Sequence, residues 1–190
     1  MNTNKNKLTS GFTSGITPLH RIAEWPQHRW PWLLLALVST GLVITALVMQ
    51  HVQGLNPCVQ CIYQRTAMIG VALFAWLGFL APQKAFVRIV AYAGWITSAW
   101  AGLSAANHHL WLQREANPLF NSCAAFPDFP TWAPLHEWFP SIFAVTGMCG
   151  DDGWRLLGLN MPEWMQIIFF ILLAIAVVIL VIRLLYLRKV

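Results

Sequence analysis

Charged residues are scarce in this sequence, and acidic residues are the scarcest of them. Only 10% of the 190 residues are Asp, Glu, Lys or Arg, whereas 57% are hydrophobic. Soluble domains carry about a quarter charged residues, so this composition excludes an ordinary water-soluble globular domain. It indicates a membrane protein that is short enough to form one domain.

The cysteines are few enough that their spacing limits which metal sites they can form. The sequence has four cysteines, Cys58, Cys61, Cys123 and Cys149. A four-cysteine zinc site normally shows two closely spaced pairs, and only the first two cysteines are close here, so the spacing argues against zinc. The stretch CVQCI lacks the histidine of C-x-x-C-H, which excludes covalent c-type haem. We therefore expect no metal site.

Four long apolar runs stand out against this background. A helix needs about 20 apolar residues to cross a hydrocarbon layer of roughly 30 Å. The sequence therefore predicts an all-α membrane protein, a bundle of four transmembrane helices, with spans at about 31–49, 62–80, 89–107 and 164–182. The first run lacks an A-x-A-like cleavage site, so we expect a retained span and not a signal peptide. The predicted division is an N-terminal extension (1–30), a membrane domain (31–186) with outer loops at 50–61 and 108–163, and a tail (187–190).

Basic residues lie mostly on one side of these four spans. That side holds nine of the 12 Lys and Arg, and the other side holds six of the seven acidic residues. By the positive-inside tendency, both termini are cytoplasmic and both cysteine-bearing loops face outward. The net charge of +5 then reflects membrane orientation, so we expect no nucleic-acid partner.

The second outer loop, residues 108–163, is too long for a simple connection. It contains six prolines, so long uninterrupted helices inside it are not expected. One part of it, PTWAPLHEWFPSIF, combines large apolar side chains with few polar ones. Such a segment can lie flat in the lipid headgroup region, or it can form a small core on top of the bundle, and the sequence leaves both possibilities open.

The first two cysteines form a C-x-x-C pair at the start of the second span, in the stretch NPCVQCIYQR. An even number of cysteines on the oxidising side of a membrane indicates disulfides, and purely structural disulfides are one interpretation. A C-x-x-C disulfide closes so small a loop that it stabilises the fold little. Pairs of this spacing at helix N-termini commonly cycle, because the helix N-terminus favours a thiolate. A redox centre is therefore the favoured interpretation.

Arg65 lies four residues after Cys61, on the same helix face and one turn deeper. A charge at that depth is costly without a partner, which makes Arg65 a candidate functional residue. The alternative is an arginine that only extends its guanidinium to the lipid headgroups.

These motifs together resemble the DsbB family of bacterial inner-membrane proteins. The matching stretches, within about residues 31–182, are QHVQGLNPCVQCIYQR, HLWLQ, WAPLHEWFPSIF, GMC and GWRLLGLNMPEW. The resemblance implies a membrane thiol:quinone oxidoreductase. Such an enzyme reoxidises a periplasmic thioredoxin-fold disulfide oxidase of the DsbA type and passes the electrons to membrane quinone, either ubiquinone or menaquinone.

The resemblance also implies roles for single residues near the quinone. Cys58 and Cys61 correspond to the pair that quinone reoxidises, with Cys61 nearest the quinone ring. Arg65 would polarise the quinone and hold the Cys61 thiolate. The stretch HLWLQ aligns His109, rather than His108, with a position near the quinone carbonyl.

The second cysteine pair would meet the protein partner. The resemblance implies that Cys123 forms a mixed disulfide with the DsbA-like protein and that Cys149 is its resolving mate. Electrons must then pass from this pair to the C-x-x-C pair, and we expect a transient approach of Cys123 to Cys58.

Three other functions compete with this one. A vitamin K epoxide reductase type enzyme is also a four-helix quinone and thiol enzyme, but there we expect a different location of the C-x-x-C pair. A non-enzymatic membrane scaffold would hold static disulfides and no quinone. A metal or haem transfer protein would use His51, His108 and His109 as ligands, although histidines near an interface are more often hydrogen-bonded polar residues.

Overall fold

The computed structural model describes residues 25–114, 124, 126–149 and 154–187, so Cys123 and the N-terminal 24 residues lie outside the described part. Four long helices make up most of it: α2 (Arg29–Val52), α3 (Val59–Leu80), α4 (Ala85–Arg114) and α7 (Met161–Leu187). The short elements are the 3₁₀ turn η1 (Trp25–Gln27), helices α5 (Leu135–Trp138) and α6 (Pro140–Phe143), and strands β1 (Arg155–Leu156) and β2 (Leu159–Asn160).

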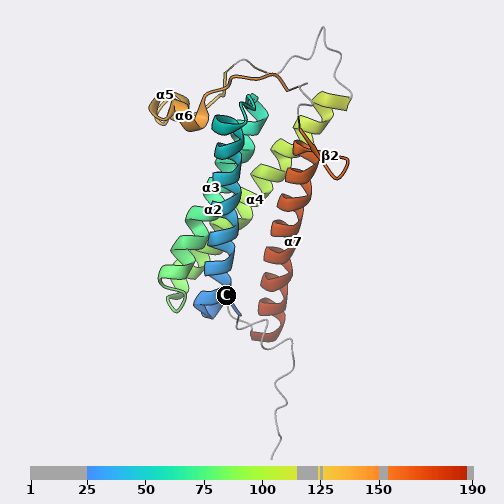
Figure 1. Ribbon diagram of the computed structural model, residues 1–190. Helices are drawn as coiled ribbons and strands as arrows, with labels where there is room; N and C mark the ends of the chain where they lie inside the picture. Colours follow the sequence, from blue (N-terminus) through green and yellow to red (C-terminus); the bar gives the residue numbers. More distant parts are fainter. Residues whose placement is uncertain (1–24, 115–123, 125, 150–153, 188–190) are drawn as a thin grey trace, which may run out of the picture.

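Each of the four long helices is long and apolar enough to cross a membrane. Helix α3 packs against α2 and α4, and α4 packs against α7 (Figure 1). The two central helices, α3 and α4, are accordingly more buried than α2 and α7. This arrangement confirms the predicted all-α fold with four spans and a long segment between the third and the fourth.

Small residues let the central helices approach their neighbours closely. Gly78 of α3 lies directly against the indole of Trp32 on α2, with no room for a Cβ. Trp32 is itself fixed, because its indole N–H donates to Pro26 O at 2.9 Å and its ring meets Tyr92 edge-on at a centroid distance of 5.2 Å. Close packing at glycine is typical of membrane bundles, where shape complementarity replaces the hydrophobic effect between helices.

Helix α4 extends seven residues past the predicted third span, to Arg114. The next proline in the chain is Pro118, so no proline ends the helix earlier. His108 and His109 therefore lie in the last turns of a helix and not in the outer loop, which gives their side chains fixed directions.

Reciprocal hydrogen bonds cap the start of α7. Asn160 Oδ1 accepts from the Glu163 N–H at 3.0 Å, and the Glu163 carboxylate accepts from the Asn160 N–H at 2.9 Å. Arg114 donates to the same carboxylate and so joins the end of α4 to the start of α7. The preceding β1–β2 hairpin turns through Leu157 and Gly158, which both have positive φ (53° and 84°), as its two-residue turn requires.

The short helices α5 and α6 lie at the same end of the bundle as the β hairpin (Figure 1). Phe143 is buried there, and Phe129 packs edge-on against Phe143 and Tyr63 at centroid distances of 6.0 Å. Trp132 and Trp138, by contrast, are 79% and 56% exposed. The segment therefore contributes to a small aromatic core and also leaves large aromatic side chains exposed. That it lies in the lipid headgroup region stays a prediction.

Candidate active site

Cys58 and Cys61 lie side by side at the start of α3. Pro57 keeps Asn56 out of the helical conformation, and Cys58 follows as the N-cap residue, with its Sγ accepting from the Cys61 N–H at 3.3 Å. The two Sγ atoms are 2.8 Å apart, and both thiols are free. A disulfide needs about 2.05 Å, so a small side-chain rotation closes the bond. The pair can therefore cycle between dithiol and disulfide.

The two thiols are not equivalent. Cys58 is 2% exposed, and its hydrogen bond to Cys61, together with burial, raises its pKa above the ordinary thiol value. Cys58 therefore keeps its proton and donates it toward Cys61. Cys61 is partly exposed and lies in the first turn of α3, where free N–H groups favour a thiolate. Cys61 is thus the available nucleophile of the pair.

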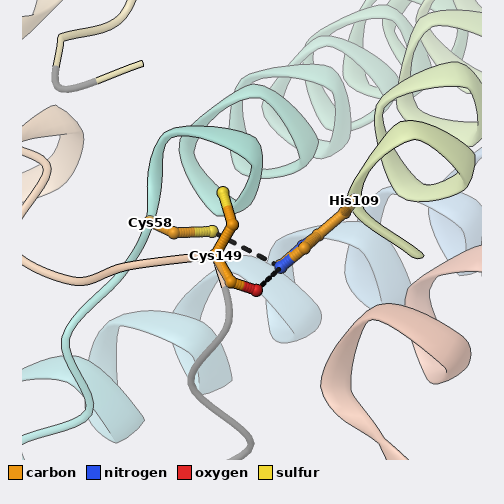
Figure 2. Close-up of side chains that lie close together, drawn as sticks. All are labelled: Cys58, His109 and Cys149. Carbon is orange, nitrogen blue, oxygen red and sulfur yellow. Dashed lines mark hydrogen bonds between the residues drawn. The ribbon is translucent and has the colours of Figure 1, made fainter. Parts of the chain in front are cut away.

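His109 of α4 points one ring nitrogen at both Cys58 and Cys149, which lie next to each other (Figure 2). Its Nε2 is 3.6 Å from Cys58 Sγ and 3.2 Å from the carbonyl oxygen of Cys149. Gln64 of α3 points its side-chain amide nitrogen at His109 Nδ1, at 3.3 Å. Because Nδ1 accepts from this amide, the ring proton is assigned to Nε2, which can donate to the carbonyl or the sulfur.

The adjacent His108 has different surroundings. Its Nδ1 is 3.0 Å from Gln60 Nε2, and its ring stacks on Trp111 at a centroid distance of 5.9 Å. His109, and not His108, lies against the C-x-x-C pair. The position of His109 near a quinone carbonyl stays a prediction. The third histidine that was considered as a metal ligand, His51, contacts the carbonyl oxygen of Ser141 instead.

Cys149 is brought to the C-x-x-C pair by the residues before it. The backbone N–H groups of Thr146 and Gly147 both donate to Pro57 O at 3.0 Å. Cys149 is disulfide-bonded. The ligand atoms of Cys58, His109 and Cys149 all lie within 4.8 Å of one another, and all three residues are buried.

Two sulfur atoms and an imidazole at this spacing resemble a soft-metal ligand set. A disulfide sulfur offers no thiolate, however, and Cys58 keeps its proton, so in this state neither sulfur is a ready ligand. The same spacing suits disulfide exchange, in which a thiolate must approach a disulfide sulfur. The expectation of no metal site stays a prediction.

Arg65 is buried, and its guanidinium is hydrogen-bonded within the protein. It is 7% exposed, and its Nη1 donates to Gln50 Oε1 at 2.6 Å and to Ile142 O at 2.5 Å. Its Nε has no hydrogen-bond partner among the described residues. A buried guanidinium with a donor still available is a feature of a ligand site.

A cavity of about 630 Å³ lies beside these residues, within the roughly 300–1,000 Å³ range of small-molecule sites. Its walls come from α2, α3, α4 and α7, from the chain before Cys58, and from the segment before α7, including Met148 and the β hairpin. Helices α2 and α7 make few contacts with each other across it. Cys61, Arg65 and His109 supply polar atoms. Most of the lining is apolar and includes five of the six methionines, Met49, Met68, Met148, Met161 and Met165. An apolar ring that carries polar oxygens fits this lining.

Two polar residues of the site were not identified from the sequence. Gln50 holds Arg65, and Gln64 holds His109. Both border apolar spans, and a polar side chain at such a depth is itself a signal for a functional contact. That signal is present in the stretches QHV and YQR, but it does not indicate which partner each amide meets.

Comparison with known proteins agrees with this geometry. Residues 28–179 match the family model described as disulfide bond formation protein DsbB. Proteins named disulfide bond formation protein B are similar over most of the chain. The one from Idiomarina loihiensis is 44% identical over 158 residues, 83% of this chain and 87% of that protein. The one from Psychromonas ingrahamii is 42% identical over 170 residues, 86% of this chain and 91% of that protein.

These matches confirm the resemblance that the motifs indicated, and they decide against a scaffold, a metal carrier and a vitamin K epoxide reductase type enzyme. The matched range covers all the described cysteines, Arg65 and His109. The chain belongs to the DsbB family, inner-membrane oxidoreductases that generate disulfides by reoxidising DsbA with quinone.

Proposed function

We propose that Cys58 and Cys61 form the pair that quinone oxidises, and that Cys123 and Cys149 form the pair that exchanges with a DsbA-like protein. The observation that carries this assignment is the position of Cys149 against Cys58, beside the cavity that Cys61 and Arg65 line. The first pair thus borders a space that an apolar oxidant can enter. The second pair belongs to the chain between α4 and α7, residues 115–160, which we call the outer segment.

The site would face the periplasm, with both termini in the cytoplasm. Basic residues support this orientation because they gather at the opposite end of the bundle, with Lys84 and Arg88 at the α3–α4 turn and Arg183 near the end of α7. In this orientation a quinone dissolved in the bilayer can reach the cavity, and the outer segment can reach a soluble thioredoxin-fold partner.

Oxidation of the partner would begin at Cys123. A partner thiolate attacks Cys123 Sγ of the Cys123–Cys149 disulfide, forms a mixed disulfide and releases Cys149 as a thiolate. The Cys149 thiolate then attacks Cys58 of the oxidised C-x-x-C pair, which forms a Cys58–Cys149 bond and releases Cys61 as a thiolate. The sequence led us to expect direct contact of Cys58 with Cys123, which lies outside the described residues. We assign the contact with Cys58 to Cys149 because the two Sγ atoms lie within 4.8 Å of each other.

His109 suits this exchange. Its Nε2–H faces Cys58 Sγ, so it can donate to the negative charge that forms on Cys58 whenever this sulfur leaves a disulfide. We therefore assign His109 to the exchange between the pairs as well as to the cavity wall.

A quinone bound in the cavity would accept two electrons and two protons. Cys61 would present its thiolate at the cavity wall, and Arg65 would offer a positive charge and its free Nε–H to a carbonyl oxygen. The methionine side chains would contact the ring and tail, since thioethers adapt to irregular apolar shapes.

The cycle closes when the second partner thiol attacks the mixed disulfide and leaves Cys123 as a thiolate. Cys123 attacks Cys149, which restores the Cys123–Cys149 disulfide and releases Cys58. Cys58 and Cys61 then form a disulfide as two electrons and two protons pass to the quinone. In total, one partner dithiol becomes a disulfide and one quinone becomes a quinol.

The assignment is tested with the purified full-length protein, reduced DsbA and, in separate assays, ubiquinone or menaquinone, by following the loss of quinone absorbance. Each single Cys→Ser variant is expected to lose nearly all turnover. Rapid alkylation during turnover should trap a Cys58–Cys149 species that non-reducing peptide mapping identifies. Full activity of Cys61→Ser, or a trapped Cys58–Cys123 species in place of Cys58–Cys149, would contradict the assignment.

A further inference from the structure

Three donors from the bundle converge on two carbonyl groups of α6. His51 Nε2 lies 3.0 Å from Ser141 O, and because a carbonyl can only accept, His51 is the donor. Gln50 Nε2 points at the same oxygen from 3.5 Å, and Arg65 Nη1 donates to Ile142 O at 2.5 Å. We call this set of contacts the carbonyl clamp.

The carbonyl clamp supplies hydrogen bonds to backbone carbonyl groups that have no partner within α6. The helix has a single turn, so its last carbonyl groups have no intrahelical partner. The Ala144 N–H bonds to Pro140 O at 2.9 Å, whereas Ser141 O and Ile142 O receive their hydrogen bonds from α2 and α3. The end of α6 is therefore held in place by the long helices.

Cys149 follows Ile142 by only seven positions, and a second contact lies between them. Thr146 and Gly147 donate to Pro57 O, and Gly147 packs so closely on Asn56 that a Cβ would collide with the Asn56 backbone. The chain from α6 to Cys149 is thus fixed at its start by the clamp and near its end by the residues before Cys58.

We propose that His51 is a positioning residue for the exchange between Cys149 and Cys58, because it holds the end of α6 from which the chain reaches Cys149. This inference rests on the proposed function, in which Cys149 is the cysteine that meets Cys58. Within the part of the chain that the structure describes, His51 has no hydrogen bond to a cysteine and does not line the cavity, and it is exposed at the end of α2. Its effect on the reaction therefore passes through the backbone of α6.

The clamp also links the outer segment to the cavity. The Arg65 guanidinium that bonds Ile142 O is the same group that lines the cavity, and Gln50 Oε1 accepts from it at 2.6 Å. Gln50 and Arg65 therefore belong to the binding machinery, whereas His51 belongs only to the clamp. This difference makes His51 the residue with which positioning can be tested by itself.

The test compares His51→Ala, His51→Gln and Gln53→Ala in the full-length protein. Gln53 is an exposed residue at the same helix end, so Gln53→Ala is the matched control. The first readout is the rate at which the Cys58–Cys149 species forms after mixing with reduced DsbA. The second is quinone reduction driven by dithiothreitol in a Cys123→Ser/Cys149→Ser background, which involves only the C-x-x-C pair.

His51→Ala is expected to slow formation of the Cys58–Cys149 species about fivefold, the effect of losing one hydrogen bond, and to leave dithiothreitol-driven turnover unchanged. His51→Gln, which keeps a side-chain N–H donor, should recover most of the rate, and Gln53→Ala should match the wild type. Equal rates for wild type and His51→Ala would overturn the positioning role, as would equal losses in both readouts. Absence of the species in the wild type would instead count against the proposed function.

Discussion

The chemistry of single residues at this site follows from where each lies on its helix. Cys58 caps α3 and is buried under the chain that carries Cys149, while Cys61 lies one turn inside and borders the cavity. The same C-x-x-C spacing thus places one thiol against Cys149 and the other at the cavity wall. In the proposed function, the first keeps its proton and the second is the thiolate that would meet the quinone. Arg65, a further turn along, completes the cavity side.

The difference between the two thiols predicts an order of alkylation. In a reduced Cys123→Ser/Cys149→Ser protein at pH 7, iodoacetamide should modify Cys61 at least about tenfold faster than Cys58. The raised pKa of Cys58 lowers its thiolate fraction at this pH, and burial blocks access. Peptide mass spectrometry over time measures both rates, and equal rates would show that the two thiols are equivalent.

The charge of Arg65 predicts a specific kinetic defect. Arg65→Gln should raise the KM for quinone about tenfold or more, since hydrogen bonds to a charged group contribute roughly 1.5–3 kcal/mol. Arg65→Lys should fall between this variant and the wild type, because it keeps the charge but not the planar set of donors. Steady-state assays over a range of quinone concentrations check this, and an unchanged KM in Arg65→Gln would remove Arg65 from the quinone site.

At the scale of elements, close helix packing supports the site. The N-terminal half of α3 carries Cys61 and Arg65, with Cys58 as its N-cap, and the C-terminal half packs against α2 where Gly78 meets Trp32. Helix α4 continues to Arg114 and so places His109 at the site. The hydrogen bond from Arg114 to Glu163 joins α4 to α7. The cavity exists because α2 and α7 flank this packed centre without closing on each other.

This packing predicts an asymmetric response to added methyl groups. Gly78→Ala forces a Cβ into the buried ring of Trp32 and should cost about 1–3 kcal/mol of stability. Gly41→Ala on α2, where nothing lies within 4 Å of the added atom, is the matched control and should leave stability unchanged or slightly higher. Thermal unfolding in detergent distinguishes the two, and equal melting temperatures for the two variants would contradict the packing.

For the whole molecule, the proposed function depends on which end of the helix bundle faces the periplasm. The C-x-x-C pair, the cavity, α5, α6 and the hairpin all lie at one end of the bundle, while the basic turn at Lys84 lies at the other. A soluble oxidase can meet this protein only if the cysteine end faces the periplasm.

Membrane-impermeant thiol labelling of whole cells checks the orientation. In a background with all four native cysteines replaced, a cysteine at Gln53 should be labelled from outside, and a cysteine at Lys84 should be labelled only after the cells are opened. Both positions are exposed in the structure, so access depends on the side of the membrane. Labelling of the Lys84 position in intact cells would invert the proposed orientation.

The sequence by itself determined the number of spans, the fold class and the position of the thiol pair. Hydropathy is a local property, so runs of apolar residues reveal helices without knowledge of their neighbours. The helix start at Cys58 is also local, because it depends on Pro57 and on the first turn of α3. Family motifs then supplied the reaction, and the matches over residues 28–179 confirm it.

Only the tertiary structure decided which groups meet across the site. It placed Cys149 against Cys58 and pointed His109 at both. It also gave Arg65 and His51 the carbonyl groups of α6 as partners. His51 and Ser141 are 90 positions apart, and a backbone carbonyl carries no residue-specific signal. Contacts of this kind depend on how the helices pack and where the outer segment returns, and neither property can be read from hydropathy or from a local motif.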